Sequence, residues 1–589
     1  MAYNSYKEDE KSVEKSKLQT LKRLLSYLLK YKWTIVLVLM LMGYCVVVSL
    51  INPLIIESAI DNHIGNKDYI GLYKLLIIAL IINLIATFAI KLRMYIMAKM
   101  CNQILLTIRQ ELYTHIQKLG FKFFDSRPTG KILSRIIGDI NSLKDVLSNC
   151  VTTLIPDFIT VCAVVIIMFS KNPKLAVAAL ISTPFMAIAI TMIQVKAHPR
   201  WQTFRKKSSN LNAFLHEDMS GMKIIHSFTA EKETEETFDE LLNEHKSSFR
   251  SAVRLSDCFG SVIDFSWGFG CVALYFIGIV VLKDENISVG TFLAFGTYIN
   301  MFWQPINNLS NFYNQITTNI AGAERIFEIL DTKPEIEDEK GVVDLPDIKG
   351  EVTFDHVTFG YDEEKVLDDV SFVIKPGETI AIVGPTGAGK STIINLISRF
   401  YDANEGRVLL DGYDVKDVSI ESLRKQVGTM TQENFIFSGT VKDNIRYGKL
   451  DATDEEIIEA AKAVNAHEFI MKLDKGYDTE LLERGGGLSI GQKQILALAR
   501  TMVSKPKILI LDEATSSIDT KTELIVQKGI DKLLGGRTSF VIAHRLSTIK
   551  RADRIFVVDN GKIIEEGNHR QLLEKKGAYY NLYMAQFNI

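Results

Sequence analysis

Cysteine is scarce in this sequence, and its placement excludes a disulfide or zinc framework. The chain contains 6 cysteines in 589 residues. They are scattered and lie mostly inside apolar runs of the first half: Cys45, Cys101, Cys150, Cys162, Cys258 and Cys271. This placement is typical of packed thiols. The part of the chain after residue 310 contains no cysteine.

The sequence also lacks an excess of charge of either sign. Its 68 Lys and Arg residues nearly balance 70 Asp and Glu residues, so nothing in the composition indicates a nucleic-acid partner. Apolar residues make up 47% of the chain and are concentrated before residue 310. A chain of this length is expected to form about two to four domains.

Six apolar runs are each long enough to cross a bilayer, which takes about 20 residues. They occupy 33–56, 72–90, 147–170, 175–193, 259–282 and 289–309. The lysine-rich N-terminus is expected to stay in the cytoplasm under the positive-inside rule. Two long polar segments, 91–146 and 194–257, then face the cytoplasm together with the C-terminal half.

The stretch before the first apolar run is expected to remain on the cytoplasmic side. Residues 1–17 are polar and predict a disordered cytosolic tail, and their acidic residues argue against a transit peptide. Leucines at helical spacing over 18–29, with basic residues among them, predict an amphipathic helix in the membrane interface. An ordinary surface helix is the alternative.

The two polar segments are largely free of glycine and proline, so each is expected to form two helices that extend the spans and turn back. The sequence PTG at 128–130 supplies the break in the first segment. Gly221 lies near the expected tip of the second. Within the spans, Asp157 and Asp264 are candidates for a substrate path, because a charge in hydrocarbon usually faces a cavity or a partner. A helix-packing contact or a protonated acid is the alternative.

One stretch in the second half carries specific chemistry. A short apolar run at 379–383 predicts a buried strand, an apolar-faced helix is expected over 393–400, and the glycine-rich turn between them matches G-x-x-x-x-G-K-[ST]. The turn consists of Gly384, Pro385, Thr386, Gly387, Ala388, Gly389, Lys390, Ser391 and Thr392. Its backbone N–H groups and the helix N-terminus suit phosphate oxygens. Lys390 is expected to hold the β and γ phosphates and Ser391 to ligate Mg²⁺. A chance match has odds of about one in fifty.

A second apolar run, Ile508 to Leu511, predicts a buried strand that ends in two acids. Asp512 and Glu513 would emerge at the carboxyl end of a parallel sheet, where ligands collect. Asp512 is expected to hold the Mg²⁺ shell, and Glu513 to act on the water that attacks the γ phosphate. The alternative is a simple solvated turn.

From about residue 18 to the C-terminus, the spans, polar segments and motifs resemble a half-transporter of the ATP-binding cassette exporter type. The resemblance implies a membrane all-α six-helix domain followed by an α/β P-loop NTPase cassette. It implies coupling helices near 124–129 and 217–221, which dock on the cassettes. It also implies three further roles: Tyr361 stacks on adenine, Gln432 reaches Mg²⁺ and the attacking water, and His544 contacts the γ phosphate.

The stretch Leu488 to Gln492, LSIGQ, resembles the family signature LSGGQ with Ile490 in place of a glycine. By the resemblance, Ser489, Gly491 and Gln492 bind the phosphate held by the opposite subunit. A branched side chain at 490 is expected to weaken that contact. Leu482 is a second departure, since glycine is common there in the family. With Glu513 intact, the pattern resembles one half of a heterodimeric exporter.

These expectations define a complete hypothesis. A tail (1–17), a transmembrane domain (18–325) and a linker (326–347) precede the cassette (348–589). The chain is expected in the bacterial cytoplasmic membrane, with ATP and Mg²⁺ as cofactors and a second half-transporter as partner. Its expected activity is ATP-driven export of a small amphipathic or hydrophobic substrate of the multidrug type. The alternatives are a lipid or peptide exporter, or a nucleotide-gated channel or sensor.

Overall fold

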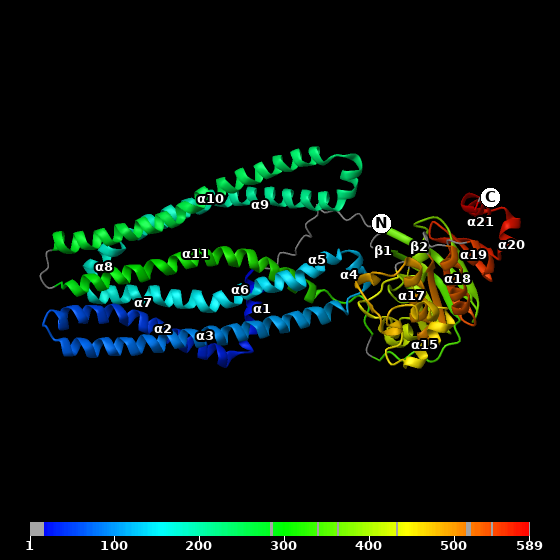
Figure 1. Cartoon of the computed structure of the whole chain (residues 1–589), viewed down its shortest axis with the longest axis horizontal. Coiled ribbons are helices and arrows are strands. Elements are labelled where there is room, and N and C mark those ends of the chain that lie inside the picture. Colours follow the sequence, from blue (N-terminus) through cyan, green and yellow to red (C-terminus); the bar gives the residue numbers. More distant parts are fainter. Residues whose placement is uncertain are drawn as a thin grey trace. The chain divides into compact units, whose positions relative to one another are not determined.

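The chain forms two compact units, seen in a computed structural model (Figure 1). The first comprises residues 1–117 and 127–332, and the second comprises 118–126 and 333–589. The structure describes residues 17–282, 287–338, 341–361, 364–431, 434–513, 520–543 and 546–587. The predicted N-terminal tail lies outside these residues, apart from Lys17.

The first unit consists of helices. In chain order they are α1 (Lys17–Leu29), α2 (Lys32–Ser58), α3 (Tyr69–Ile116), α5 (Thr129–Ser134), α6 (Ile140–Asn149), α7 (Ile155–Lys171), α8 (Pro173–Leu180), α9 (Thr183–Phe228), α10 (Glu231–Phe276) and α11 (Val289–Asp331). Four π-helical segments, Ala59–Ile64, Arg135–Asp139, Cys150–Leu154 and Ile277–Leu282, continue them. The long helices α2, α3, α7, α9, α10 and α11 run alongside one another.

Five helical stretches of the described chain are long and apolar enough to cross a membrane. They are Lys32–Ile64, Tyr69–Ile116, Thr129–Lys171, Pro173–Phe228 and Glu231–Val281. Each contains one of the first five predicted spans. The sixth predicted span, 289–309, lies within α11, which is helical throughout but is not among these five.

The core of this unit is built around α11. Phe295, Tyr298 and Ile299 are each 1% exposed or less, and Trp303 lies one turn further along the same face. The hydroxyl of Tyr298 donates to the carbonyl oxygen of Leu50 in α2 at 2.9 Å. This bond satisfies the one polar atom of a buried aromatic side chain.

The polar segments form long helices, as the sequence predicts, but one turn lies elsewhere. In the first segment α4 (Phe121–Asp125) ends and α5 begins around Pro128, where the break is expected. In the second segment Gly221 lies inside α9, and the chain reverses at Thr229, whose φ is 53°. A single glycine in a helix costs only about 1 kcal/mol, which is too little to end a helix of this length.

Helix α1 confirms the predicted helix near the N-terminus, and its apolar face is covered by protein. Leu24 and Leu28 are 0% and 4% exposed. The Arg23 guanidinium lies 4.4 Å from the centre of the Phe327 ring in α11 and 2.7 Å from the carboxylate of Asp331. A location in the membrane interface stays a prediction.

The second unit is built on a six-stranded sheet of order β12-β11-β3-β10-β9-β6. Its strands are β3 (Thr379–Val383), β6 (Val427–Met430), β9 (Ile508–Glu513), β10 (Thr538–Ala543), β11 (Arg554–Asp559) and β12 (Lys562–Gly567). All pairs are parallel except β11 with β12. An apolar core lies on each face of this sheet.

An antiparallel sheet of order β2-β1-β4-β5 flanks it, and β7 pairs with β8. These strands are β1 (Val352–Tyr361), β2 (Glu364–Ile374), β4 (Glu405–Leu410), β5 (Tyr413–Asp414), β7 (Gly439–Thr440) and β8 (Glu480–Leu481). The helices of the unit are α4, α12 (Lys390–Ile397), α13 (Ile420–Gln426), α14 (Val441–Arg446), α15 (Asp454–Ala463), α16 (His467–Ile470), α17 (Ile490–Ser504), α18 (Thr520–Leu534), α19 (Leu546–Arg551), α20 (His569–Lys575) and α21 (Ala578–Phe587). The predicted strands at 379–383 and 508–511 are thereby confirmed.

Candidate nucleotide site and helix contacts

The glycine-rich turn joins β3 to α12, the arrangement that the motif requires. Gly384 has a φ of 151°, and a Cβ there would lie 2.0 Å from the carbonyl oxygen of Val558 in β11. Gly389 has a φ of 104°, and its Cβ would lie 2.8 Å from Leu367. Only glycine avoids both the backbone strain and these overlaps. The turn is therefore fixed by the strands around it.

Lys390 is folded back onto its own turn. Its Nζ donates to the carbonyl oxygens of Gly384 at 2.9 Å and Pro385 at 2.8 Å. Burial lowers the pKa of Lys390, and the negative charge of Asp512 opposes that shift. A phosphate group would favour the charged form and replace the two carbonyl contacts.

The sheet brings the two sequence motifs to one edge. β10 lies between β3 and β9, with Ile542 paired to Ile382 on one side and to Asp512 on the other. Because all three strands are parallel, their carboxyl ends meet beside the glycine-rich turn. Asp512 is half-buried there. The side chain of Glu513 and all of His544 and Gln432 lie outside the described parts of the structure, so their predicted roles stay predictions.

Ser391 and Asp512 are the oxygen donors at this edge for which a metal role is predicted. The described residues include no group of three or more His, Cys, Asp or Glu side chains that could hold an ion. The Ser391 hydroxyl and the Asp512 carboxylate are hard oxygen donors of the kind that Mg²⁺ prefers, with phosphate oxygens completing the shell. The donor set therefore fits Mg²⁺ bound together with a phosphate ligand.

Tyr361 lies at the end of β1, beside α12. Its hydroxyl is 3.5 Å from the Thr392 hydroxyl and accepts from the Asn395 amide at 3.5 Å. Its ring is 37% exposed and meets the Tyr401 ring edge-on at 5.1 Å. Thr392 is buried. The contacts anchor the hydroxyl end of Tyr361 near the phosphate turn, and stacking on a base stays a prediction.

The LSIGQ stretch forms the start of α17. Ser489 caps the helix: its hydroxyl accepts from the Gln492 N–H at 3.3 Å, and the Gln492 side-chain oxygen accepts from the Ser489 N–H at 2.9 Å. Gly491 is buried, whereas the Ile490 side chain is 58% exposed. Ser489 and Gln492 thus bond to each other, and among the described residues neither makes a hydrogen bond to the glycine-rich turn.

Arg500, which was not predicted from the sequence, joins α17 to Phe435 and to Asn444 of α14. Its guanidinium donates to the Phe435 carbonyl at 2.9 Å, to the Asn444 carbonyl at 2.8 Å and to the Asn444 side chain at 3.0 Å. Burial lowers its pKa. The sequence does show a basic residue at the end of the apolar stretch ILALAR, and this could have indicated a buried arginine.

Helix α4, which belongs to the second unit by its contacts, lies on the segment that follows α12. The ring centres of Phe121 and Phe400 are 4.4 Å apart. The Tyr401 hydroxyl donates to the Asp125 carboxylate. Burial and this carboxylate raise the pKa of Tyr401 well above its usual range, so the hydroxyl stays a donor. The resemblance implies such docking near 124–129, but it does not single out Tyr401.

Comparison with known proteins places these features in a family. The family model for the ABC transporter transmembrane region matches residues 33–306, and the model for the ABC transporter cassette matches 367–516. An uncharacterized ABC transporter ATP-binding protein of Bacillus subtilis, YknV, is 42% identical over 96% of this chain and 94% of its own.

Two further relatives carry functional names. The "Putative multidrug export ATP-binding/permease protein" of Staphylococcus aureus is 37% identical over 96% of this chain and 100% of its own. An ATP-dependent lipid A-core flippase of Syntrophus aciditrophicus is 39% identical over 82% of this chain and 81% of its own. A solved bacterial Atm1-family ABC exporter with ATP bound matches with a TM-score of 0.78 and 28% identity, over 94% of this chain and 98% of that one.

Proposed function

The chain belongs to the ABC transporter family as a membrane-bound exporter half whose cytoplasmic cassette couples ATP hydrolysis to transport, and on that premise we propose that it exports small amphipathic or hydrophobic molecules of the multidrug type. An exporter half of this kind works as a dimer within the bilayer.

The observation that supports this substrate class is a pair of apolar pockets in the membrane-spanning unit. One, of about 400 Å³, lies between α7 and α11. The other, of about 650 Å³, lies between α9 and α10, where Phe185, Met186 and Phe265 are among its lining residues. Both volumes fall within the usual range for drug-sized ligands. Apolar linings bind by burial of surface and accept varied shapes.

Lipid export is the second candidate, and the flippase among the relatives favours it. The two substrate classes make different demands on a pocket. A pocket for a phospholipid must hold two long chains and a charged headgroup. A pocket for a compact multidrug substrate needs to hold only one apolar body. The transport assay below includes a probe of each class.

For the chemistry, we propose that residues 384–392 hold the phosphates of ATP and that Tyr361 stacks on the adenine. Ser391, Asp512 and Gln432 would hold Mg²⁺, which when bound offsets the charge of the phosphates. Glu513 would accept a hydrogen bond or a proton from the attacking water, and His544 would contact the γ phosphate.

We also propose that the working transporter is a heterodimer, because Ile490 adds a branched, exposed side chain to the signature. The cassette of the partner would then face a weakened signature at one of the two composite sites. The test is to purify the chain alone and together with proteins that co-purify from the native membrane. ATPase activity should be low alone and rise with the partner. A fully active homodimer would contradict the proposal. In that case the substitution Ile490→Gly should leave the ATPase rate of the homodimer unchanged.

Transport itself is tested in proteoliposomes to which ATP and Mg²⁺ are added. The fluorescence of a probe in the lumen is followed over time. A lipophilic fluorescent dye should accumulate on ATP addition, whereas a fluorescent phospholipid should not move between leaflets. Glu513→Gln should abolish both turnover and dye movement, because it removes the ionisable carboxylate. ATP turnover without vectorial movement of either probe would favour a channel or sensor.

A further inference from the structure

We propose that Asp157 and Asn308 form the recognition site for the positive group of an amphipathic organic cation in the pocket between α7 and α11. The proposal rests on the multidrug-type export proposed above and names its substrate charge. It is carried by the geometry of this pocket and by the electrostatics of a carboxylate inside it.

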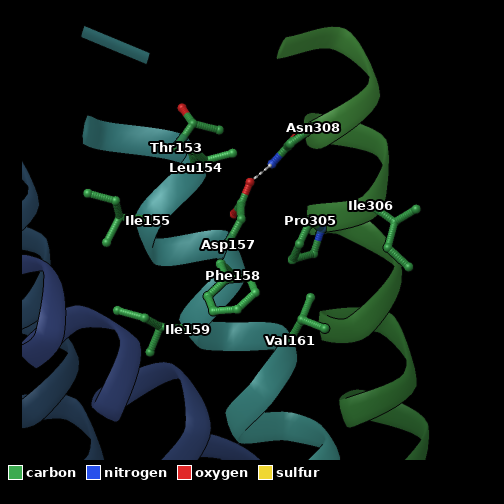
Figure 2. Close-up of a pocket in the computed structure, with 10 residues that line it drawn as sticks. All are labelled: Thr153, Leu154, Ile155, Asp157, Phe158, Ile159, Val161, Pro305, Ile306 and Asn308. Carbon is green, nitrogen blue, oxygen red and sulfur yellow. Dashed lines mark hydrogen bonds between the residues drawn. The ribbon is translucent and has the colours of Figure 1, made fainter. Parts of the chain in front are cut away.

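The two residues come from opposite walls of the pocket. The Asn308 side-chain amide donates to one carboxylate oxygen of Asp157 at 3.0 Å. Figure 2 shows this bond crossing from α7 to α11, with the Asp157 carboxylate directed into the gap between the helices. The remaining walls are mostly apolar: Leu154, Ile155, Phe158, Ile159, Val161, Pro305 and Ile306, with Thr153 at one end.

Both helices are irregular at this point, which keeps the site open. Pro156 follows a π-helical turn (Cys150–Leu154) and begins α7, and Pro305 interrupts the hydrogen bonds of α11. π-Helical turns and prolines within spanning helices are frequent where ligands bind. Pro156 directly precedes Asp157, and Pro305 lies one helical turn before Asn308.

The pocket is at a depth that suits uptake from the inner side of the membrane. Lys171, at the outer end of α7, pairs with Glu57 at 2.9 Å. Asp157 precedes it by 14 residues along the helix, which is about 21 Å at 1.5 Å per residue. In a hydrocarbon layer of about 30 Å, the carboxylate lies in the half nearer the cytoplasm.

A packing role alone does not explain a carboxylate here. Asn308 is its only hydrogen-bond partner among the described residues, and it supplies one donor to a group that accepts several. No basic side chain of the described chain lies within ion-pair distance of it. A charge in an apolar membrane pocket needs a counter-charge. The positive group of an organic cation bound in the pocket would supply that counter-charge.

The apolar walls specify the rest of the ligand. Phe158 is 70% exposed and lies one residue from Asp157, so an aromatic face is available beside the carboxylate. An organic cation can place its charge near the carboxylate and over this ring while its apolar body fills the cavity. A hydrated inorganic cation would leave the apolar walls without a partner.

The test measures equilibrium binding of tetraphenylphosphonium and of the similarly shaped anion tetraphenylborate to the purified transporter in lipid nanodiscs without ATP. The wild type should bind the cation at least about tenfold more tightly than the anion. Asp157→Asn should remove that preference, and Asp157→Glu should retain it. Glu244→Gln is the control, because it neutralises an acid that pairs with Lys207 outside the spans and should keep the preference.

The outcomes are distinct. Equal binding of the two ions by the wild type, or unchanged cation binding by Asp157→Asn when Asp157→Glu is folded and binds, would overturn the proposal. Because binding is measured without ATP, it is independent of the transport assay. Cation binding through Asp157 without vectorial transport would overturn the proposed export function and leave the site intact.

Discussion

At the scale of single residues, the glycine-rich turn depends on positions where no side chain fits. Gly384 is held between β3 and β11 in a conformation that other residues rarely adopt, and the Val558 carbonyl occupies the position of a Cβ. The same loop leaves Lys390 half-buried with two carbonyl partners, so its charge is available for phosphates. Backbone geometry therefore positions the Lys390 side chain.

Gly384→Ala is expected to lower the free energy of unfolding of the cassette by about 2 to 4 kcal/mol, because of the overlap with Val558 and the strained φ. ATP affinity should fall with it. Gly412→Ala is the control: its φ is 84° and no atom lies within 4 Å of a Cβ, so it carries strain without overlap. Denaturant unfolding and nucleotide titration check both variants, and equal losses would contradict the steric explanation.

At the scale of elements, the short helix α4 packs on the segment that follows α12. Helix α4 touches the rest of its unit through the Phe121 to Phe400 ring contact and the Tyr401 to Asp125 hydrogen bond. Tyr401 also touches Tyr361, the predicted adenine contact. Tyr401 thus contacts both α4 and Tyr361.

Tyr401→Phe is expected to keep the ring contacts and lose only the hydrogen bond to Asp125, at about 1 kcal/mol. Substrate stimulation of ATPase should decrease while the basal rate persists. The measurement is ATPase activity with and without substrate, together with Asp125→Asn and the double variant. If the two losses add fully, the residues do not act through this bond.

The C-terminal helices provide a prediction on pH. His569 in α20 is 2.6 Å from the Tyr579 hydroxyl in α21, and the pKa of Tyr579 is raised to about 12 by burial. The pKa of His569 is lowered, first by burial and then by the charge of Lys550. The neutral ring therefore accepts the tyrosine O–H, and protonation removes this bond.

Because the unfolded chain binds the proton more readily, this contribution is present above pH 6.5 and is lost as the pH falls through the lowered folded-state pKa. Hydrogen exchange in 578–587 should accelerate between pH 7.5 and 5.5 beyond the intrinsic rate. His569→Gln should reduce this pH dependence. His356 serves as the internal comparison. Asp369 raises the pKa of His356, so its contribution to stability is present at low pH and is lost as the pH rises.

At the scale of the whole molecule, transport requires that the spans separate where they are now joined. At the outer end, Glu57 accepts from Lys171 of α7 and from Thr291 of α11, both at 2.9 Å. Asp61 accepts from Ser288 and from the Gly290 N–H. Glu57, at the end of α2, thus joins the ends of α7 and α11, and Asp61, in the π-helical segment after α2, adds two bonds to the start of α11.

Asp61→Ala is expected to weaken this closure and to shift the population toward outward opening by about tenfold, which corresponds to the loss of about 1.4 kcal/mol. A cysteine placed at Ile287, which is partly buried and takes no part in these bonds, should then react faster with a membrane-impermeant thiol reagent, with Asp61→Glu as the control. Equal labelling rates with and without the substitution would show that these bonds do not hold the outer end closed.

Local patterns were enough for a large part of this protein. The strand, turn and helix around Lys390, the strand that ends at Glu513 and the long apolar helices were predictable, because each follows from neighbouring residues through periodicity, glycine and hydrophobicity. The family membership followed from the same motifs and is confirmed by the comparisons.

Only the tertiary structure decided which distant residues meet. Asn308 lies opposite Asp157, Tyr401 lies on α4, and the turn of the second polar segment falls at Thr229 instead of Gly221. The reason is physical: one glycine inside a helix costs only about 1 kcal/mol, so α9 continues past Gly221 and ends where Thr229 takes a left-handed conformation. Contacts between residues more than a hundred positions apart depend on packing, and no local pattern encodes them.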